Sequence, residues 1–242
     1  MTIRTGPQWL TRHTYAHRGL HSRGVVENSK TAMEQAVAAG FGIECDIQMS
    51  ADKVPLVFHD WDLDRLTGVH GSVADHNATN LCQICLKDSD DTIWTLAELL
   101  ELVGGKVPIL VEVKSLPEFD IDSACAAIND LVAGYSGALA VMSFDPRMGE
   151  WFAQHSADVP RGLVCTDTLD HGFLSAWRQP GALERASPDF LAIDVRDLPN
   201  AMSQIWRETG RPLLTWTVRT QHDRAKVGVC ADAAIAEGDG VE

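Results

Sequence analysis

Basic residues are scarce in this chain of 242 residues, in which 20 Lys and Arg face 34 Asp and Glu. The formal net charge is −14 at pH 7. Such an acidic surface repels phosphate backbones at long range, so we expect no nucleic-acid partner. A small phosphate ligand is still compatible with this charge, because local cations and a divalent metal can reverse the field inside one pocket.

The sequence also lacks long apolar runs. Its longest uncharged stretch, residues 131–144, contains Gly134 and Gly137. A membrane-spanning helix needs about 20 mostly apolar residues, so we expect no stable membrane association. The N-terminus lacks the apolar segment of a secretory signal, and the six cysteines are then most simply reduced thiols. The sequence therefore predicts a cytoplasmic protein and leaves its oligomeric state open.

Short apolar runs alternate with helical patterns along most of the chain. We expect eight strands, at residues 14–16, 42–47, 54–58, 109–113, 139–142, 162–165, 190–193 and 213–218. We expect helices at residues 31–39, 96–103, 123–133, 147–155, 201–209 and 221–229. This alternation predicts an α/β fold, a (β/α)8 TIM-type barrel, as a single domain over residues 1–242.

Three stretches stand outside this alternation. No helical pattern separates the second and third expected strands, and residues 49–53 are typical of a tight connection. Residues 61–94 are polar with little periodicity, so we expect a small polar insertion over the barrel mouth. A last apolar run, Ala233–Ala236, could close the barrel beside the first strand.

Carboxylates gather at the ends of the expected strands, where α/β enzymes place their chemistry. Glu44 and Asp46 are two residues apart, so their side chains project from the same face of a strand. Glu112 repeats this placement on a later strand. Buried like charges are costly unless a cation balances them, and oxygen ligands favour Mg²⁺ or Ca²⁺. An internal salt bridge is the alternative for one such pair, and it explains the whole set less well.

Histidines and cations accompany these carboxylates. His17 and His59 each end an expected strand and each precede a charged residue. Two imidazoles can divide proton transfer, with one accepting and the other donating. Arg18 offers a planar fork suited to phosphate oxygens, and Lys114 faces the same way as Glu112.

Taken in order, these motifs resemble those of the glycerophosphodiester phosphodiesterases. The matching motifs are His17-Arg18-Gly19, Glu27-Asn28-Ser29, Glu44-Cys45-Asp46, His59-Asp60, Glu112-Val113-Lys114 and Trp216-Thr217. Residues 63–67 and 95–100 are also similar to the family. The resemblance implies a metal-dependent barrel enzyme that hydrolyses glycerophosphodiesters to glycerol 3-phosphate and an alcohol.

The resemblance also implies a role for each matching residue. His17 and His59 would be the general acid and base, while the divalent metal would be held by Glu44, Asp46 and Glu112. Whether the nucleophile is water or the substrate's own 2-hydroxyl stays open, and the second route passes through a cyclic phosphate.

The remaining roles concern the substrate. Arg18 and Lys114 would neutralise the phosphate, and Trp216 would pack against the glycerol or the leaving group. Ser29 replaces the usual Thr, and either hydroxyl can cap the helix that follows. Arg219 stands where many members carry Asn; a cation there could change the leaving-group preference or point to solvent, and we favour solvent.

Two alternative functions remain open. A phospholipase with the same barrel would attack lipid phosphodiesters, but the acidic residues of the 61–94 stretch would be repelled by an anionic membrane. A barrel that only binds phosphodiesters would usually lack a histidine or a metal carboxylate, and all of them are present here. Cys82 and Cys85 form a single CxxC, for which two unrelated thiols are the simpler interpretation and a zinc site the alternative.

Overall fold

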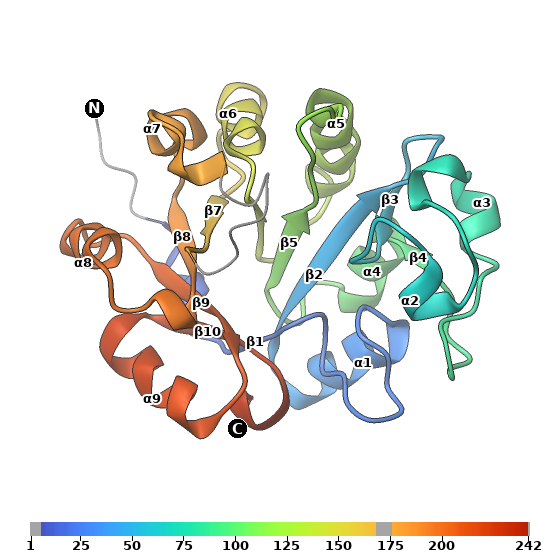
Figure 1. The fold of residues 1–242 in the computed structure, drawn as a ribbon, viewed down its shortest axis with the longest axis horizontal. Coiled ribbons are helices and arrows are strands. Elements are labelled where there is room, and N and C mark those ends of the chain that lie inside the picture. The colour runs from blue at the N-terminus through green and yellow to red at the C-terminus, as the bar shows by residue number, and fades with distance from the viewer. Residues whose placement is uncertain (1–5, 168–175, 242) are drawn as a thin grey trace. The chain divides into compact units, whose positions relative to one another are not determined.

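The computed structural model describes residues 6–167 and 176–241, which divide into two compact units (Figure 1). The amino unit comprises Ala16–Lys114 and Asp120–Ala138, and the carboxyl unit comprises Met1–Tyr15, Ser115–Phe119 and Leu139–Glu242. Among the described residues, every helix is too short or too polar to cross a membrane. The cytoplasmic location stays a prediction.

Two parallel strands form the centre of the amino unit. β2 (Gly42–Met49) pairs with β5 (Ile109–Val113), and every residue of both strands is buried. Helix α1 (Lys30–Ala39) packs on β2 and on α4 (Leu96–Val103), while α5 (Ile121–Val132) packs on α4. These three helices lie within two residues of their predicted ends, because their apolar positions recur at helical spacing.

The third predicted strand is not a parallel barrel strand. β3 (Pro55–Val57) pairs antiparallel with β2, and β4 (Trp94–Thr95) pairs antiparallel with β3. The reason is the short connection after β2, in which the hydroxyl of Ser50 accepts the backbone N–H of Val54 at 2.9 Å. A parallel return needs a crossover of a dozen or more residues, which this turn does not provide.

The 61–94 stretch has more internal structure than its polarity indicates. It contains α2 (Asp64–Thr67), the 3₁₀ turn η2 (Val73–Asp75) and α3 (Ala78–Leu81). Its apolar side chains form a core with those of the β3 region: Leu56, Phe58, Leu63, Leu66, Val73, Ala78, Leu81, Leu86 and Ile93. These residues are spaced too irregularly to give a helix or strand period, so the sequence pattern did not reveal the core.

The carboxyl unit is a run of parallel strands joined by helices (Figure 1). Its strands are β6 (Leu139–Ser143), β7 (Arg161–Cys165), β8 (Phe190–Asp194), β9 (Leu213–Val218) and β10 (Ala233–Ala236), each paired in parallel with the next. Its helices are α6 (Pro146–His155), α7 (Ala182–Ala186), α8 (Ala201–Glu208) and α9 (Gln221–Cys230). α7 was not predicted, because five residues are too few to show a period. The expectation that Ala233–Ala236 is a strand is confirmed.

Candidate active site

Three carboxylates from the two central strands meet in the amino unit. Asp46 on β2 lies directly opposite Glu112 on β5, and Glu44 lies two residues earlier on β2. One oxygen from each side chain lies within 4.8 Å of those of the other two. All three residues are buried. The structure thus brings together the residues predicted to hold a metal, here called the carboxylate cluster.

Two cations face the carboxylate cluster. The Nζ atom of Lys114 lies 2.7 Å from Oδ1 of Asp46 and 2.6 Å from Oε1 of Glu112. The Nε atom of Arg18 lies 3.2 Å from Oδ2 of Asp46, as an ion pair without a hydrogen bond. Three negative charges therefore meet two positive ones, which leaves one negative charge in excess when all are ionised.

The two carboxylates of β2 have opposite electrostatic surroundings. Burial, together with the charges of Asp46 and Glu112, raises the pKa of Glu44 well above its ordinary value. Burial also acts to raise the pKa of Asp46, but the nearby charges of Lys114, His59 and Arg18 outweigh it and hold that pKa far below its ordinary value. Asp46 is thus paired within the chain, while Glu44 most lacks a cation.

Asn28 holds the turn of the His17-Arg18-Gly19 motif against the cluster. Its Nδ2 donates to Oδ2 of Asp46 at 2.9 Å, and its backbone N–H donates to the carbonyl of Arg18 at 2.8 Å. In that turn, Gly19 has φ 80°, and a Cβ there would lie 2.9 Å from the backbone of Ala32 in α1. Only glycine fits both the backbone angle and the close approach to the helix.

Ser29 begins the helix that follows this turn. Its hydroxyl accepts the backbone N–H of Ala32 at 3.1 Å, so the predicted cap of α1 is confirmed. The backbone of Arg18 also donates to Oε2 of Glu44 at 3.0 Å. The glycine, the cap and these backbone hydrogen bonds together fix the motif beside the carboxylates.

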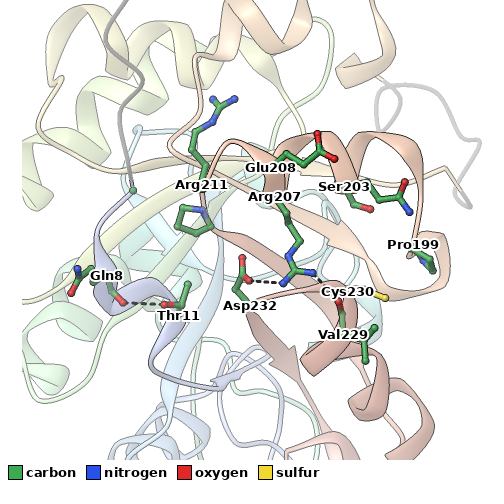
Figure 2. A pocket seen from close by; sticks show the side chains of 14 residues that line it. Gln8, Thr11, Pro199, Ser203, Arg207, Glu208, Arg211, Val229, Cys230 and Asp232 are labelled. Atoms are coloured by element: carbon green, nitrogen blue, oxygen red, sulfur yellow. Dashed lines mark hydrogen bonds and ion pairs between the residues drawn. The ribbon is translucent and has the colours of Figure 1, made fainter.

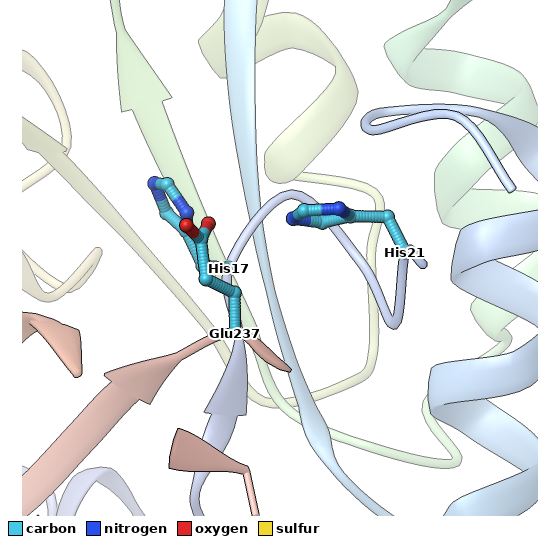
Figure 3. A group of neighbouring side chains, drawn as sticks. All are labelled: His17, His21 and Glu237. Atoms are coloured by element: carbon cyan, nitrogen blue, oxygen red, sulfur yellow. The ribbon is translucent and has the colours of Figure 1, made fainter. Parts of the chain in front are cut away.

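The two predicted proton-transfer histidines both lie in the amino unit. His17 directly follows β1 (Tyr15–Ala16) and is buried; it is drawn in Figure 3 with His21 of the same segment. His59 follows β3, and its carbonyl accepts a hydrogen bond from Nε2 of Gln48 at 3.0 Å. The Nδ1 atom of His59 lies 2.7 Å from Oδ1 of Asp60, which leaves Nε2 as the nitrogen available for proton transfer.

Several polar residues around the site were not assigned from the sequence. They are Glu27, Asn28, Gln48, Asp60 and Arg65. Four of them belong to the motifs or the 63–67 stretch that resemble the family, so the resemblance was the signal that could have found them. Gln48 continues the alternation of Glu44 and Asp46 along β2, which places it on the same face.

Trp216 and Arg219 belong to the carboxyl unit. The indole of Trp216 on β9 donates to the carbonyl of Ala192 at 3.0 Å, and it meets the ring of Phe144 edge-on with centroids 5.5 Å apart. Its contact with substrate stays a prediction. Arg219 is 56% exposed, in line with the favoured interpretation, and its Nε lies 2.6 Å from Oε1 of Glu237; its role in leaving-group preference stays open.

The carboxyl unit also contains a hollow of about 1210 Å³, lined by the start of the described chain, α8 and the end of α9 (Figure 2). Its cations are engaged within the unit. Arg207 donates to the carbonyl of Val229 at 2.7 Å and lies 3.3 Å from Asp232, while the guanidinium of Arg211 lies 3.4 Å from the ring centre of Trp206. These contacts balance the charges of the hollow locally.

Comparison with known proteins identifies the family. Residues 17–237 match the model of the Glycerophosphoryl diester phosphodiesterase family. The chain belongs to this family. Membership confirms the predicted resemblance and the predicted class of enzyme, a glycerophosphodiester phosphodiesterase.

Two curated relatives show how far the similarity extends. The glycerophosphodiester phosphodiesterase of Caldanaerobacter subterraneus subsp. tengcongensis is 35% identical over 108 residues, which are 41% of this chain and 44% of that protein. The Bacillus subtilis protein YhdW is 26% identical over 222 residues, which are 88% of each chain. The chain thus matches the first relative over less than half of that relative's length, and the second over most of it.

Solved structures establish the fold. An Oleispira antarctica phosphodiesterase, solved with the product sn-glycerol-3-phosphate, has a TM-score of 0.80 at 21% identity, covering 93% of this chain and 92% of that one. A glycerophosphodiester phosphodiesterase from Thermotoga maritima has a TM-score of 0.74 at 24% identity, covering 95% of each chain. These likenesses confirm the predicted (β/α)8 barrel class.

Proposed function

We propose that this chain hydrolyses glycerophosphodiesters to glycerol 3-phosphate and an alcohol, using a divalent metal. The observation that carries this proposal is the buried carboxylate cluster with Lys114 and Arg18 against it. A phosphodiester brings a negative phosphate, which needs cations, and a leaving alkoxide, which needs a proton. Both requirements match residues of the amino unit. The product bound to the Oleispira antarctica phosphodiesterase supports a small-molecule substrate of this kind.

Glu44, Asp46 and Glu112 would hold the metal. Their carboxylate oxygens are the ligands that hard cations prefer, which favours Mg²⁺ or Ca²⁺. The excess negative charge of the cluster and the raised pKa of Glu44 both fit a site made for an additional cation. When bound, the metal would polarise a phosphoryl oxygen and orient a hydroxyl.

The chain's own side chains would do the remaining work. Arg18 and Lys114 would neutralise the phosphate, because the guanidinium of Arg18 is always charged and the ammonium of Lys114 is held charged. Burial acts to lower the pKa of Lys114, but the charges of Asp46 and Glu112 outweigh it and raise that pKa. His17 and His59 would divide proton transfer: one takes the proton of the attacking hydroxyl, and the other protonates the departing alkoxide. Trp216 would pack against the glycerol or the leaving group. Water and the substrate's own 2-hydroxyl are both compatible as nucleophile.

A release assay tests the proposal. Purified protein is incubated with glycerophosphocholine, glycerophosphoethanolamine or glycerophosphoglycerol, with and without added Mg²⁺, Ca²⁺ or Mn²⁺, and glycerol 3-phosphate is measured. We expect release that depends on metal and stops with a chelator, and no comparable activity on a phosphomonoester. Full activity after chelation would contradict the metal, and no release from any diester would contradict the function.

A further inference from the structure

A continuous series of ion pairs connects Arg18 to His59 within the amino unit. The Nη1 atom of Arg18 lies 2.6 Å from Oε1 of Glu27, and Arg65 contacts both oxygens of Glu27, at 2.8 and 3.1 Å. Arg65 also contacts both oxygens of Asp60, at 2.6 and 2.8 Å. The Oδ1 atom of Asp60 then lies 2.7 Å from Nδ1 of His59. None of these contacts involves the carboxylate cluster itself.

Arg65 is the centre of this series. Its guanidinium makes a two-point contact with Glu27 on one side and another with Asp60 on the other. A planar fork can hold two carboxylates at fixed angles, whereas the single ammonium of a lysine cannot. Arg65 is 50% exposed, but Glu27 and Asp60 are only 16% and 21% exposed. A surface salt bridge contributes little to stability, so stability alone does not explain why one guanidinium is held by two carboxylates at once.

We propose that Arg65 is a positioning residue, which acts on catalysis through Asp60 and His59 and is itself held by Glu27. By clamping both oxygens of Asp60, Arg65 fixes the carboxylate that accepts the Nδ1 proton of His59. The imidazole then keeps the tautomer and orientation that present Nε2 to the substrate. This inference rests on the proposed function, in which His59 transfers a proton.

A double-mutant cycle tests the proposal. We expect Arg65→Met to lower kcat/KM about 10- to 100-fold, the loss typical when a residue that orients a functional side chain is removed. If Arg65 acts through His59, the same change made in a His59→Ala background should cost at least fivefold less than it does in the parent. A purely structural role would reduce the folded fraction equally in both backgrounds. Equal losses would therefore overturn the proposal.

Two further variants define what the side chain contributes. Arg65→Lys keeps the charge but loses the planar fork, so we expect its kcat/KM to lie between those of the parent and of Arg65→Met. Full activity in Arg65→Lys would overturn the proposal. Arg65→Lys also replaces Arg65→Met in the cycle if that variant does not fold. Asp64→Asn is the matched control, because Asp64 is the neighbour of Arg65 in α2 and pairs with His70 instead. We expect it to stay within twofold of the parent.

A measurement without turnover separates this inference from the proposed function. Nitrogen-15 NMR of the histidine side chains should show His59 with its proton on Nδ1 in the parent and in Asp64→Asn, and a mixture of tautomers in Arg65→Met. An unchanged tautomer in Arg65→Met would overturn the positioning role. An inactive parent that still showed the expected tautomer change would contradict the proposed function while supporting the positioning role.

Discussion

The carboxylate cluster of the amino unit and the hollow of the carboxyl unit hold their charges in opposite ways. In the cluster, three buried carboxylates face two cations, and the pKa of Glu44 is raised. In the hollow, Arg207 is engaged by Asp232 and by the carbonyl of Val229 (Figure 2), and Arg211 by the indole of Trp206. Unbalanced buried charge is costly, so a fold keeps it only where a ligand completes it. A hollow whose charges are already paired within the chain needs no ligand, however large its volume.

The largest expected effect comes from the two histidines of the amino unit, His17 and His59. His17→Ala and His59→Ala should each lower activity by about 10²–10⁴-fold, the usual contribution of a general acid or base. Comparing a nitrophenyl diester with a natural one identifies the acid, because a good leaving group needs no proton. The variant that lost the acid should be partly rescued, and the other should not. Equal losses on both substrates in both variants would contradict this division of roles.

Replacing Glu44 with Gln removes one negative charge from the carboxylate cluster and should change how the stability of the metal-free protein depends on pH. Because the folded-state pKa of Glu44 is raised, the stability it contributes is full below its unfolded pKa of about 4.3 and is lost as pH rises through the folded value. Metal-free Glu44→Gln should therefore be more stable than the parent at neutral pH, and this gain should shrink on acidification. Each kcal/mol gained raises Tm by about 2–4 °C.

A second measurement compares how much added metal raises the Tm of the parent and of Glu44→Gln. Mg²⁺ or Ca²⁺ should raise the Tm of the parent more than that of Glu44→Gln, because the variant has lost one charged ligand. A parent that is more stable than the variant without metal, at every pH, would show that Glu44 carries no excess charge.

The smallest expected effect is in the hollow. Arg207→Met removes the contacts of Arg207 with Asp232 and with the carbonyl of Val229. Both charged side chains of this pair are partly exposed, so the free energy of unfolding should fall by less than about 1 kcal/mol. Activity should stay within twofold of the parent. A tenfold loss of activity at unchanged Tm would show that the hollow takes part in the reaction and would end the contrast between the two units.

The parts predicted well from the sequence are those with local causes. The alternation along β2 placed Glu44 and Asp46 on one face, and the 109–113 run placed Glu112 on a strand of its own. That this strand is the neighbour of β2 is seen only in the structure. Ser29 and its helix followed from capping chemistry. These features depend on residues a few positions apart, so the pattern contains them.

The parts that were missed depend on distant partners. The direction of β3 follows from the short turn at Ser50, but counting apolar runs treated it as one more parallel strand. The role of Arg65 exists only because Glu27, 38 residues earlier, reaches the same guanidinium. No spacing along the chain encodes that contact, and the family resemblance marked both residues without explaining them.

The apolar core of the 61–94 stretch links folding to activity. Phe58 belongs to that core and directly precedes His59, while Asp60 and Arg65 extend from the core's edge. Segments of this kind can open and close without unfolding the rest of a protein. An opening of this core would displace His59 together with Arg65, so it would interrupt the proton transfer proposed for His59 while the rest of the chain stays folded. Amide hydrogen exchange in this stretch, compared with the rest of the chain, would measure how often that opening occurs.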